Sequence, residues 1–297
     1  MGRILVGISS WAEPELIKAG FYPPEVKTPA ARLQFYASRF NVAEIDSSYH
    51  FFPTRHNLEL WLENTPDGFT FDVRAFSLFT QHPTQFSSLP GTIREKYGAE
   101  IHAKSGVYPH HLPPAALDEL WDIFNRNTEA FLKAKRLGAV LFQFPPWFHP
   151  EPANYEYISS CRKKIPQFRM AVEFRVGSWL DKHLAETLKF LREREITLVC
   201  VDEPQGFKSS VPPVAEVTAP LSIVRFHGRN AENWERHDVT ATEKFNYLYN
   251  DSELEEWAAK VKAMAAQCEE LHLVFKNKHA EFPVKNALQM KRLLGLA

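Results

Sequence analysis

Hydrophobic and polar positions follow one another along the chain in a repeating order of short and long segments. Short runs rich in β-branched and aromatic residues occupy 3–9, 42–48, 69–75, 138–144, 170–175, 196–202, 221–227 and 271–277. Longer stretches, with apolar residues spaced as on one helix face, occupy 31–40, 56–65, 116–137, 153–165, 181–195, 253–271 and 284–294. Strands that alternate with helices in this way predict βαβ units and a parallel sheet.

Eight such strands in 297 residues are typical of a TIM-like (β/α)8 barrel of the α/β class. We expect one domain over residues 1–297. A doubly wound open sheet is the alternative, but the first strand is followed by "GISSW" at 7–11 rather than by a GxGxxG motif.

Three segments interrupt the alternation, and each follows a strand. Residues 76–115 form a long insertion that carries four histidines, residues 203–220 are rich in proline, and residues 228–250 are polar and aromatic. We therefore expect an irregular or missing sixth helix. Segments that follow strands lie on the C-terminal face of a barrel, where long loops usually build or cover a site.

Charged residues recur at alternate positions of the predicted strands. Side chains i and i+2 share a face of a strand, which pairs Arg225 with His227 and Glu173 with Arg175. Since the opposite faces are apolar and suit packing against helices, we expect the charged faces to point into the barrel mouth. The predicted constellation comprises Asp46, Arg74, Gln143, Glu173, Arg175, Asp202, Arg225 and His227, together with Lys276 or Asn277.

Four arginines in this region indicate an anionic ligand, such as a phosphate ester or a nucleic-acid fragment. Arg74, Arg175, Arg225 and Arg229 would clamp the anion, because guanidinium groups form bidentate hydrogen bonds with oxyanions. Glu173, Asp202 or Asp46 would act as the base and His227 as the acid of a hydrolase or isomerase. The segments "HGRN", which ends at Asn230, and "KNK" follow strands seven and eight, where barrels often hold phosphate.

A divalent metal bound by Glu173, Asp202 and His227 is a second-ranked version of this site, since neighbouring arginines would repel the ion. No other cofactor is indicated. The histidines of the insertion, His82, His102, His110 and His111, lack HxH or HExxH spacing and are interpreted as loop residues.

Other functions are compatible with the same residues. A carbohydrate hydrolase would use the carboxylates of Glu173 and Asp202, with Trp11, Trp179 and Tyr49 stacking on a sugar. A module without catalysis would bind an anion or nucleic acid. The charges could also form a purely structural ion-pair network that fills the barrel.

Composition narrows these alternatives only slightly. The net charge is −1 and the isoelectric point about 6.9, which gives no global attraction to nucleic acid or membranes. Three widely separated cysteines without CxxC spacing indicate a reduced, cytoplasmic protein. No apolar run reaches the roughly 18 residues of a membrane span. The sequence does not determine the oligomeric state.

Several motifs together resemble the YecE-like family, known as domain of unknown function 72. They are "GISSW" (7–11), "EIDSSYHFFP" (44–53), "LFQFPP" (141–146), "VEFRVGSW" (172–179), "VRFHGRN" (224–230), "FNYLYNDSELEEW" (245–257) and "VFKNKHAEFPVKNA" (274–287). The resemblance extends over nearly the whole chain in the expected order. It implies a TIM-like barrel and no particular activity.

Overall fold

The computed structural model describes residues 1–101 and 106–296. Eight parallel strands form a closed barrel in the order β1-β2-β3-β4-β5-β6-β7-β8. They are β1 (Arg3–Ile8), β2 (Val42–Ile45), β3 (Thr70–Arg74), β4 (Leu137–Gln143), β5 (Met170–Glu173), β6 (Thr197–Asp202), β7 (Leu221–Phe226) and β8 (Glu270–Phe275). The pairing of β1 with β8, from Arg3 opposite Glu270 to Ile8 opposite Phe275, closes the ring. The predicted TIM-like barrel is confirmed.

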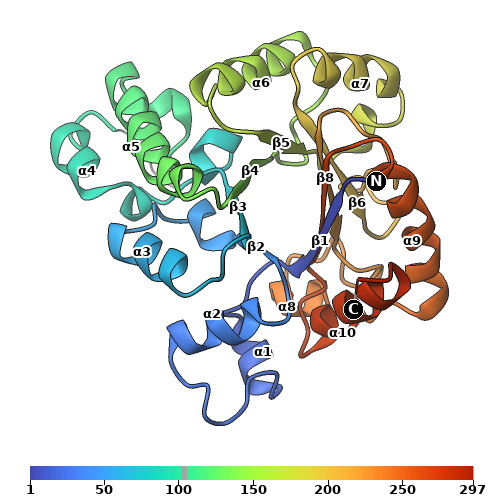
Figure 1. Ribbon diagram of the computed structural model, residues 1–297. Coiled ribbons are helices and arrows are strands. Elements are labelled where there is room, and N and C mark those ends of the chain that lie inside the picture. Colours follow the sequence, from blue (N-terminus) through green and yellow to red (C-terminus); the bar gives the residue numbers. More distant parts are fainter. Residues whose placement is uncertain (102–105, 297) are drawn as a thin grey trace.

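Helices surround the barrel, as Figure 1 shows. They are α1 (Pro14–Lys18), α2 (Pro29–Ala37), α3 (Arg55–Glu63), α4 (Gly91–Tyr97), α5 (Pro114–Lys133), α6 (Pro152–Lys164), α7 (Leu184–Arg192), α8 (Ala241–Lys244), α9 (Asp251–Ala265) and α10 (Phe282–Leu293). Short 3₁₀ turns follow several strands: η1 (Asp46–Tyr49), η2 (Ser77–Thr80), η3 (Phe86–Ser88), η4 (Pro109–His111) and η5 (Gly177–Trp179). None of the helices in the described part of the chain is both long and apolar enough to span a membrane.

The outward faces of the strands form the apolar layer beneath the helices. Phe226 of β7 stacks on Phe275 of β8 with ring centroids 4.3 Å apart, and its edge meets Trp257 of α9. Because side chains alternate along a strand, Arg225 and His227 then point into the barrel. This packing fixes the direction of the charged face of β7.

The interior near the N-terminal ends of the strands also carries charge. His272 of β8 is completely buried between Asp72 of β3 and Glu270, at 2.9 and 3.1 Å. Burial opposes the imidazolium, but the two carboxylates outweigh it and raise the pKa of His272 to about 9. The bottom of the barrel is therefore closed by an ionic triad within the apolar core.

The three irregular segments differ in content. Residues 203–220, all of which the structure describes, contain no helix, as predicted. The 76–115 segment contains η2, η3, α4 and η4, and a bridge between Thr84 and Val107. The 228–250 segment contains only the single turn of α8.

Candidate active site at the C-terminal end of the barrel

Arg225 is the central side chain of the barrel interior and is completely buried. Its Nη2 donates to Glu44 Oε1 of β2 at 2.8 Å. Its Nη1 forms an ion pair with Glu173 of β5 and lies 3.2 Å from Gln143 Oε1 of β4. Burial opposes its charge, but the two carboxylates raise the pKa of Arg225 above its ordinary value. One guanidinium therefore joins β7 to three other strands.

Glu173 also accepts a hydrogen bond from His227, with Nε2 3.0 Å from Oε1. Both side chains are buried. Burial is the main reason that the pKa of His227 falls to about 3, and Arg175 and Arg225 contribute. The imidazole is therefore neutral at pH 7. Since Glu173 is held as a carboxylate by its cationic neighbours, the imidazole proton lies on Nε2 and leaves a lone pair on Nδ1. Within the described residues, Nδ1 has no hydrogen-bond partner.

A second ion pair lies beyond Glu173, closer to the C-terminal end of the barrel. Arg175 Nη1, just past β5, donates to Glu203 Oε2 at 2.7 Å, and its guanidinium lies 4.8 Å from the Trp234 ring centroid. Burial raises the pKa of Glu203 to about 7 against the opposing effect of Arg175. Trp234, from the segment after β7, is completely buried and covers this pair from the outside of the barrel mouth.

On the opposite side of the mouth, Arg74 of β3 donates to Asp46 Oδ1 at 2.6 Å. Its guanidinium lies 4.3 Å from the half-buried ring of Tyr49. Lys278 donates to the other oxygen of Asp46 at 3.1 Å and to Glu13 at 2.6 Å. Asp46 is thus shared between two cations, and these cations and Lys276 hold its pKa well below the usual range despite burial.

Lys276 follows β8 and differs from the other cations of the mouth. It is 6% exposed, yet no carboxylate oxygen of residues 1–101 and 106–296 lies within 4.0 Å of its ammonium. Its ammonium lies 5.8 Å from the Phe245 ring centroid. Burial, together with the positive charges of Arg225 and Arg74, lowers the pKa of Lys276 to about 7.

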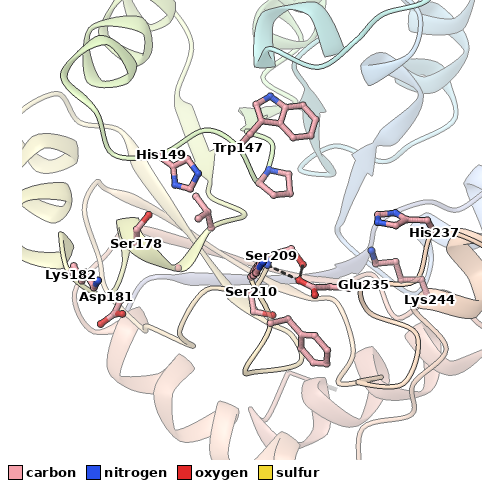
Figure 2. A pocket seen from close by; sticks show the side chains of 15 residues that line it. Trp147, His149, Ser178, Asp181, Lys182, Ser209, Ser210, Glu235, His237 and Lys244 are labelled. Carbon is pink, nitrogen blue, oxygen red and sulfur yellow. Dashed lines mark hydrogen bonds between the residues drawn. The ribbon is translucent and has the colours of Figure 1, made fainter.

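A pocket of about 1090 Å³ opens beside this cluster on the C-terminal face. Figure 2 shows Trp147 and His149 along one side of it and Lys244 and His237 along another, with Ser209 between. The loops after β4, β5, β6 and β7 supply its walls. The pocket is connected to the buried cluster through Trp234, because the Lys244 ammonium lies 5.2 Å from the centroid of that ring.

The pocket carries more cationic than anionic groups. Its lining includes Lys182, Lys208 and Lys244, as well as His149 and His237. The carboxylates in the lining belong to Asp181 and Glu235, and Glu235 accepts hydrogen bonds from Ser209 N and Oγ at 3.1 and 3.2 Å.

The structure corrects the predicted position of Asp202, which lies outside the mouth. Its carboxylate accepts hydrogen bonds from Trp257 Nε1 of α9 at 2.6 Å and from Tyr249 at 2.7 Å. Arg229, expected to bind the ligand anion, donates to the same carboxylate at 2.6 and 2.8 Å. Asp202 therefore faces the helical layer, and Glu203, the next residue, faces inward in its place.

Two predicted binding amides also lie away from the mouth. Asn277 donates to Tyr247 O and to Asn286 Oδ1 of α10, at 2.8 and 2.9 Å. Asn230 donates to Glu243 O at 2.9 Å. Both side chains hold loop backbone or helix side chains in place.

The two tryptophans expected to stack on a ligand are core residues. Trp11 is 8% exposed and packs against Trp61 and Phe71. Trp179 is completely buried, stacks on Phe174, and donates from Nε1 to Phe148 O. An aromatic residue just past a strand can turn toward the helices as readily as toward the mouth, and both do so here.

These positions exclude two of the predicted arrangements. Glu173 points into the barrel and Asp202 out of it, so they cannot act as a carboxylate pair on one sugar. For the same reason Glu173, Asp202 and His227 cannot share a metal ion. In the described part of the chain, no group of three His, Cys, Asp or Glu side chains is arranged to hold one. His102 lies outside the described residues.

Sequence reasoning missed four residues of the cluster: Glu44, Glu203, Trp234 and Phe245. Sequence reasoning could have identified Glu44, because Glu44 precedes Asp46 by two positions and therefore shares its face of the predicted strand. Glu203 was missed because Asp202, the preceding residue, was expected to point into the mouth, which would have turned Glu203 away from it. Nothing in the sequence indicated which aromatic residues of 228–250 would cover the mouth.

The closed parallel barrel, with a polar cluster at the C-terminal ends of its strands, defines a TIM-barrel protein with a candidate site at the usual place. A family model described as "Protein of unknown function DUF72" matches residues 5–297. The chain therefore belongs to the DUF72 family, which is the resemblance that the motifs indicated.

Relatives agree over almost the full length. The UPF0759 protein YunF of Bacillus subtilis is 31% identical, covering 99% of this chain and 95% of the relative. A crystal structure of a DUF72 family protein from Enterococcus faecalis matches with a TM-score of 0.80 at 26% identity, over 99% of this chain and 96% of the other. A DUF72 protein from Thermotoga maritima matches with a TM-score of 0.76 at 29% identity, over 99% of each chain.

Proposed function

We propose that the protein is an enzyme acting on a small anionic substrate at the C-terminal end of the barrel. The observation that carries the proposal is a lysine-bearing pocket that approaches the buried Glu173–His227 pair through Trp234, whose ring centroid lies 5.2 Å from Lys244 Nζ and 6.4 Å from the His227 ring centroid. Its volume of about 1090 Å³ suits a small ligand, since such pockets usually measure about 300–1,000 Å³. Lys182, Lys208 and Lys244 would attract the anion, and Arg175 lies behind the Trp234 ring that Lys244 contacts.

The proposed chemistry is proton transfer by Glu203, with His227 positioning the substrate. Glu173 fixes the tautomer and orientation of the imidazole, in the way that a buried carboxylate orients a histidine of an active site. The free lone pair of Nδ1 would accept a hydrogen bond from the substrate or from water. The carboxyl of Glu203, with a pKa of about 7, would exchange a proton near neutral pH.

The binding half of the proposal is tested by calorimetric titration with inorganic pyrophosphate at low salt. The double variant Lys208→Gln/Lys244→Gln should bind about ten-fold more weakly, with a flatter salt dependence. Lys133→Gln is the control, because this exposed lysine lies at the end of α5 and pairs with Glu129. Equal binding by the double variant and the control would show that the pocket is not where the anion binds.

The catalytic half is tested with a mixture of small anionic metabolites followed by mass spectrometry. The native protein should consume at least one compound that His227→Gln leaves unchanged, while His227→Gln still binds pyrophosphate. Binding without consumption of any compound would instead indicate a non-enzymatic anion-binding module.

A further inference from the structure

In the part of the chain that the structure describes, Lys276 is a buried cation without an ion-pair partner. The other cations of the mouth are paired: Arg74 with Asp46, Arg175 with Glu203, and Arg225 with Glu44 and Glu173. A buried ammonium is costly unless it is paired. The amine form, which carries no charge, is therefore favoured at Lys276.

The neighbours of Lys276 strengthen this preference. Arg225 of β7 and Arg74 of β3 repel the ammonium, whereas Glu44 and Asp46 of β2 and η1 attract it but are already engaged by these arginines and by Lys278. Phe245 covers the side chain from the segment after β7. The resulting pKa of about 7 leaves a large fraction of Lys276 as a neutral amine at physiological pH.

Lys278 provides a built-in comparison only two residues away. Its ammonium is held by Glu13 and Asp46 at 2.6 and 3.1 Å. Burial acts against the charge at Lys278 too, yet the two carboxylates raise its pKa above the ordinary value. Two lysines at the same barrel end thus have pKa values shifted in opposite directions, because among the described residues Lys278 has two carboxylates within 4 Å and Lys276 has none.

We propose that Lys276 is a nucleophile that forms an imine with a carbonyl substrate carrying an anionic group. This inference deepens the proposed function and rests on it for the anionic part of the substrate. A neutral lysine amine in a buried, cation-flanked setting is the form that attacks carbonyl carbons. His227 lies against the same Phe245 ring, with centroids 5.8 Å apart, and so belongs to the same covered site.

The step balances without a further reactant. The lone pair of Lys276 Nζ forms a bond to the carbonyl carbon, giving a carbinolamine. The carbon–oxygen bond then breaks, and one water leaves with the carbonyl oxygen and two hydrogens from the amine. Protonation of the C=N nitrogen takes up one proton and gives an iminium. Its positive charge withdraws electrons from the adjacent carbon and makes a proton on that carbon more acidic.

The substrate would enter from the pocket. Lys244, which lines the pocket, immediately precedes Phe245, which covers Lys276. An anionic group held by the pocket lysines would place a carbonyl beneath this ring only if Phe245 moves aside. Removal of the ring by Phe245→Ala opens this path but also exposes the ammonium, so the pH at which imine formation sets in should rise.

Reductive trapping tests the inference on the native protein. The protein is incubated with glyoxylate, an anionic aldehyde, and sodium cyanoborohydride, and the modified lysines are located by peptide mass spectrometry. At pH 7.5 we expect modification at Lys276 about ten-fold or more faster than at Lys278, with a rate that rises around pH 7. Pyrophosphate should slow the reaction, and Phe245→Ala should move its pH dependence to higher pH.

Two further arms separate this inference from the proposed function. Propionaldehyde is a neutral aldehyde, and the rate at Lys276 with each aldehyde is expressed relative to the rate at the exposed Lys133. If both aldehydes label Lys276 at similar rates and pyrophosphate does not bind, the nucleophile stands and the anionic substrate is wrong. If pyrophosphate binds but Lys276 is labelled no faster than Lys278 or the exposed Lys133, the inference is overturned and the proposed function stands.

Discussion

His227 Nε2 lies 3.0 Å from Glu173 Oε1, and neither side chain reaches solvent. The carboxylate selects one neutral tautomer of the imidazole, because it can only accept a hydrogen bond. Arg225 at Oε2 and Arg175 at Oε1 keep the carboxylate ionised. The pair is thus one unit whose protonation is set by the surrounding guanidinium groups.

The first prediction concerns the protonation of this unit. Since burial lowers the pKa of His227 to about 3, its imidazole nitrogen signals in NMR should not change between pH 5 and pH 8. The folded state binds this proton less readily than the unfolded chain. The stability contributed by neutral His227 is therefore present above about pH 6.5 and is lost as the pH falls toward 3. A His227 titration midpoint near 6.5 would contradict the burial of this pair.

The second prediction concerns the partners of Arg225. Glu44→Gln leaves the buried guanidinium with one carboxylate fewer, and should lower the free energy of unfolding by about 3 kcal/mol in urea denaturation. Glu59→Gln is the matched control. Its partner Arg55 has a side chain 91% exposed, so the change should be below about 0.5 kcal/mol. Similar losses in both variants would argue against a central role for Arg225.

The third prediction uses His272 at the opposite end of the barrel. Its pKa is raised to about 9, so the folded state keeps the proton that the unfolded chain releases near pH 6.5. The stabilisation is complete below about pH 6.5 and disappears as the pH rises through 9. Over this window the free energy of unfolding should fall by about 3 kcal/mol. In His272→Asn the free energy of unfolding should fall much less over the same pH range. An equal fall in both proteins would show that His272 is not the group responsible.

The fourth prediction separates structural from functional carboxylates. Asp202→Asn weakens a network that holds Arg229, Tyr249 and Trp257 on the outer face of the barrel. We expect a loss of about 2–4 kcal/mol of stability, with a red-shifted tryptophan fluorescence. Pyrophosphate affinity, measured well below the melting temperature, should stay within about two-fold of the native value. A large loss of pyrophosphate affinity in the folded variant would show that Asp202 does contribute to the binding site.

The extent to which the sequence predicts this site depends on the strand. In β7, Arg225 and His227 occupy alternate positions and the intervening Phe226 is apolar. The sequence therefore distinguishes a charged face of this strand from an apolar one. In β6, Asp202 is the last charged residue of an otherwise apolar run, and its direction depends on partners about 25–55 positions later along the chain. Periodicity within one strand cannot reveal such partners, because it fixes which residues share a face but not which way the face points.

The same limitation applies to the aromatic residues. Trp11 and Trp179 each follow a strand, as do residues that line barrel mouths, but the helices beside them provide larger apolar surfaces to cover. The residues that do cover the mouth, Trp234 and Phe245, come from a segment with little regular structure. Their position follows from the final packing around Arg175 and Lys276 rather than from any local pattern.

The contacts of Arg225 also constrain the order in which the protein can fold while it is being synthesised on the ribosome. Glu44 and Glu173 emerge with the second and fifth strands, long before residue 225 is synthesised. A nascent chain that ends before β7 would have to bury both carboxylates without the guanidinium that they share. The two carboxylates can therefore be buried at low cost only after the seventh strand has arrived, one strand before β8 closes the barrel.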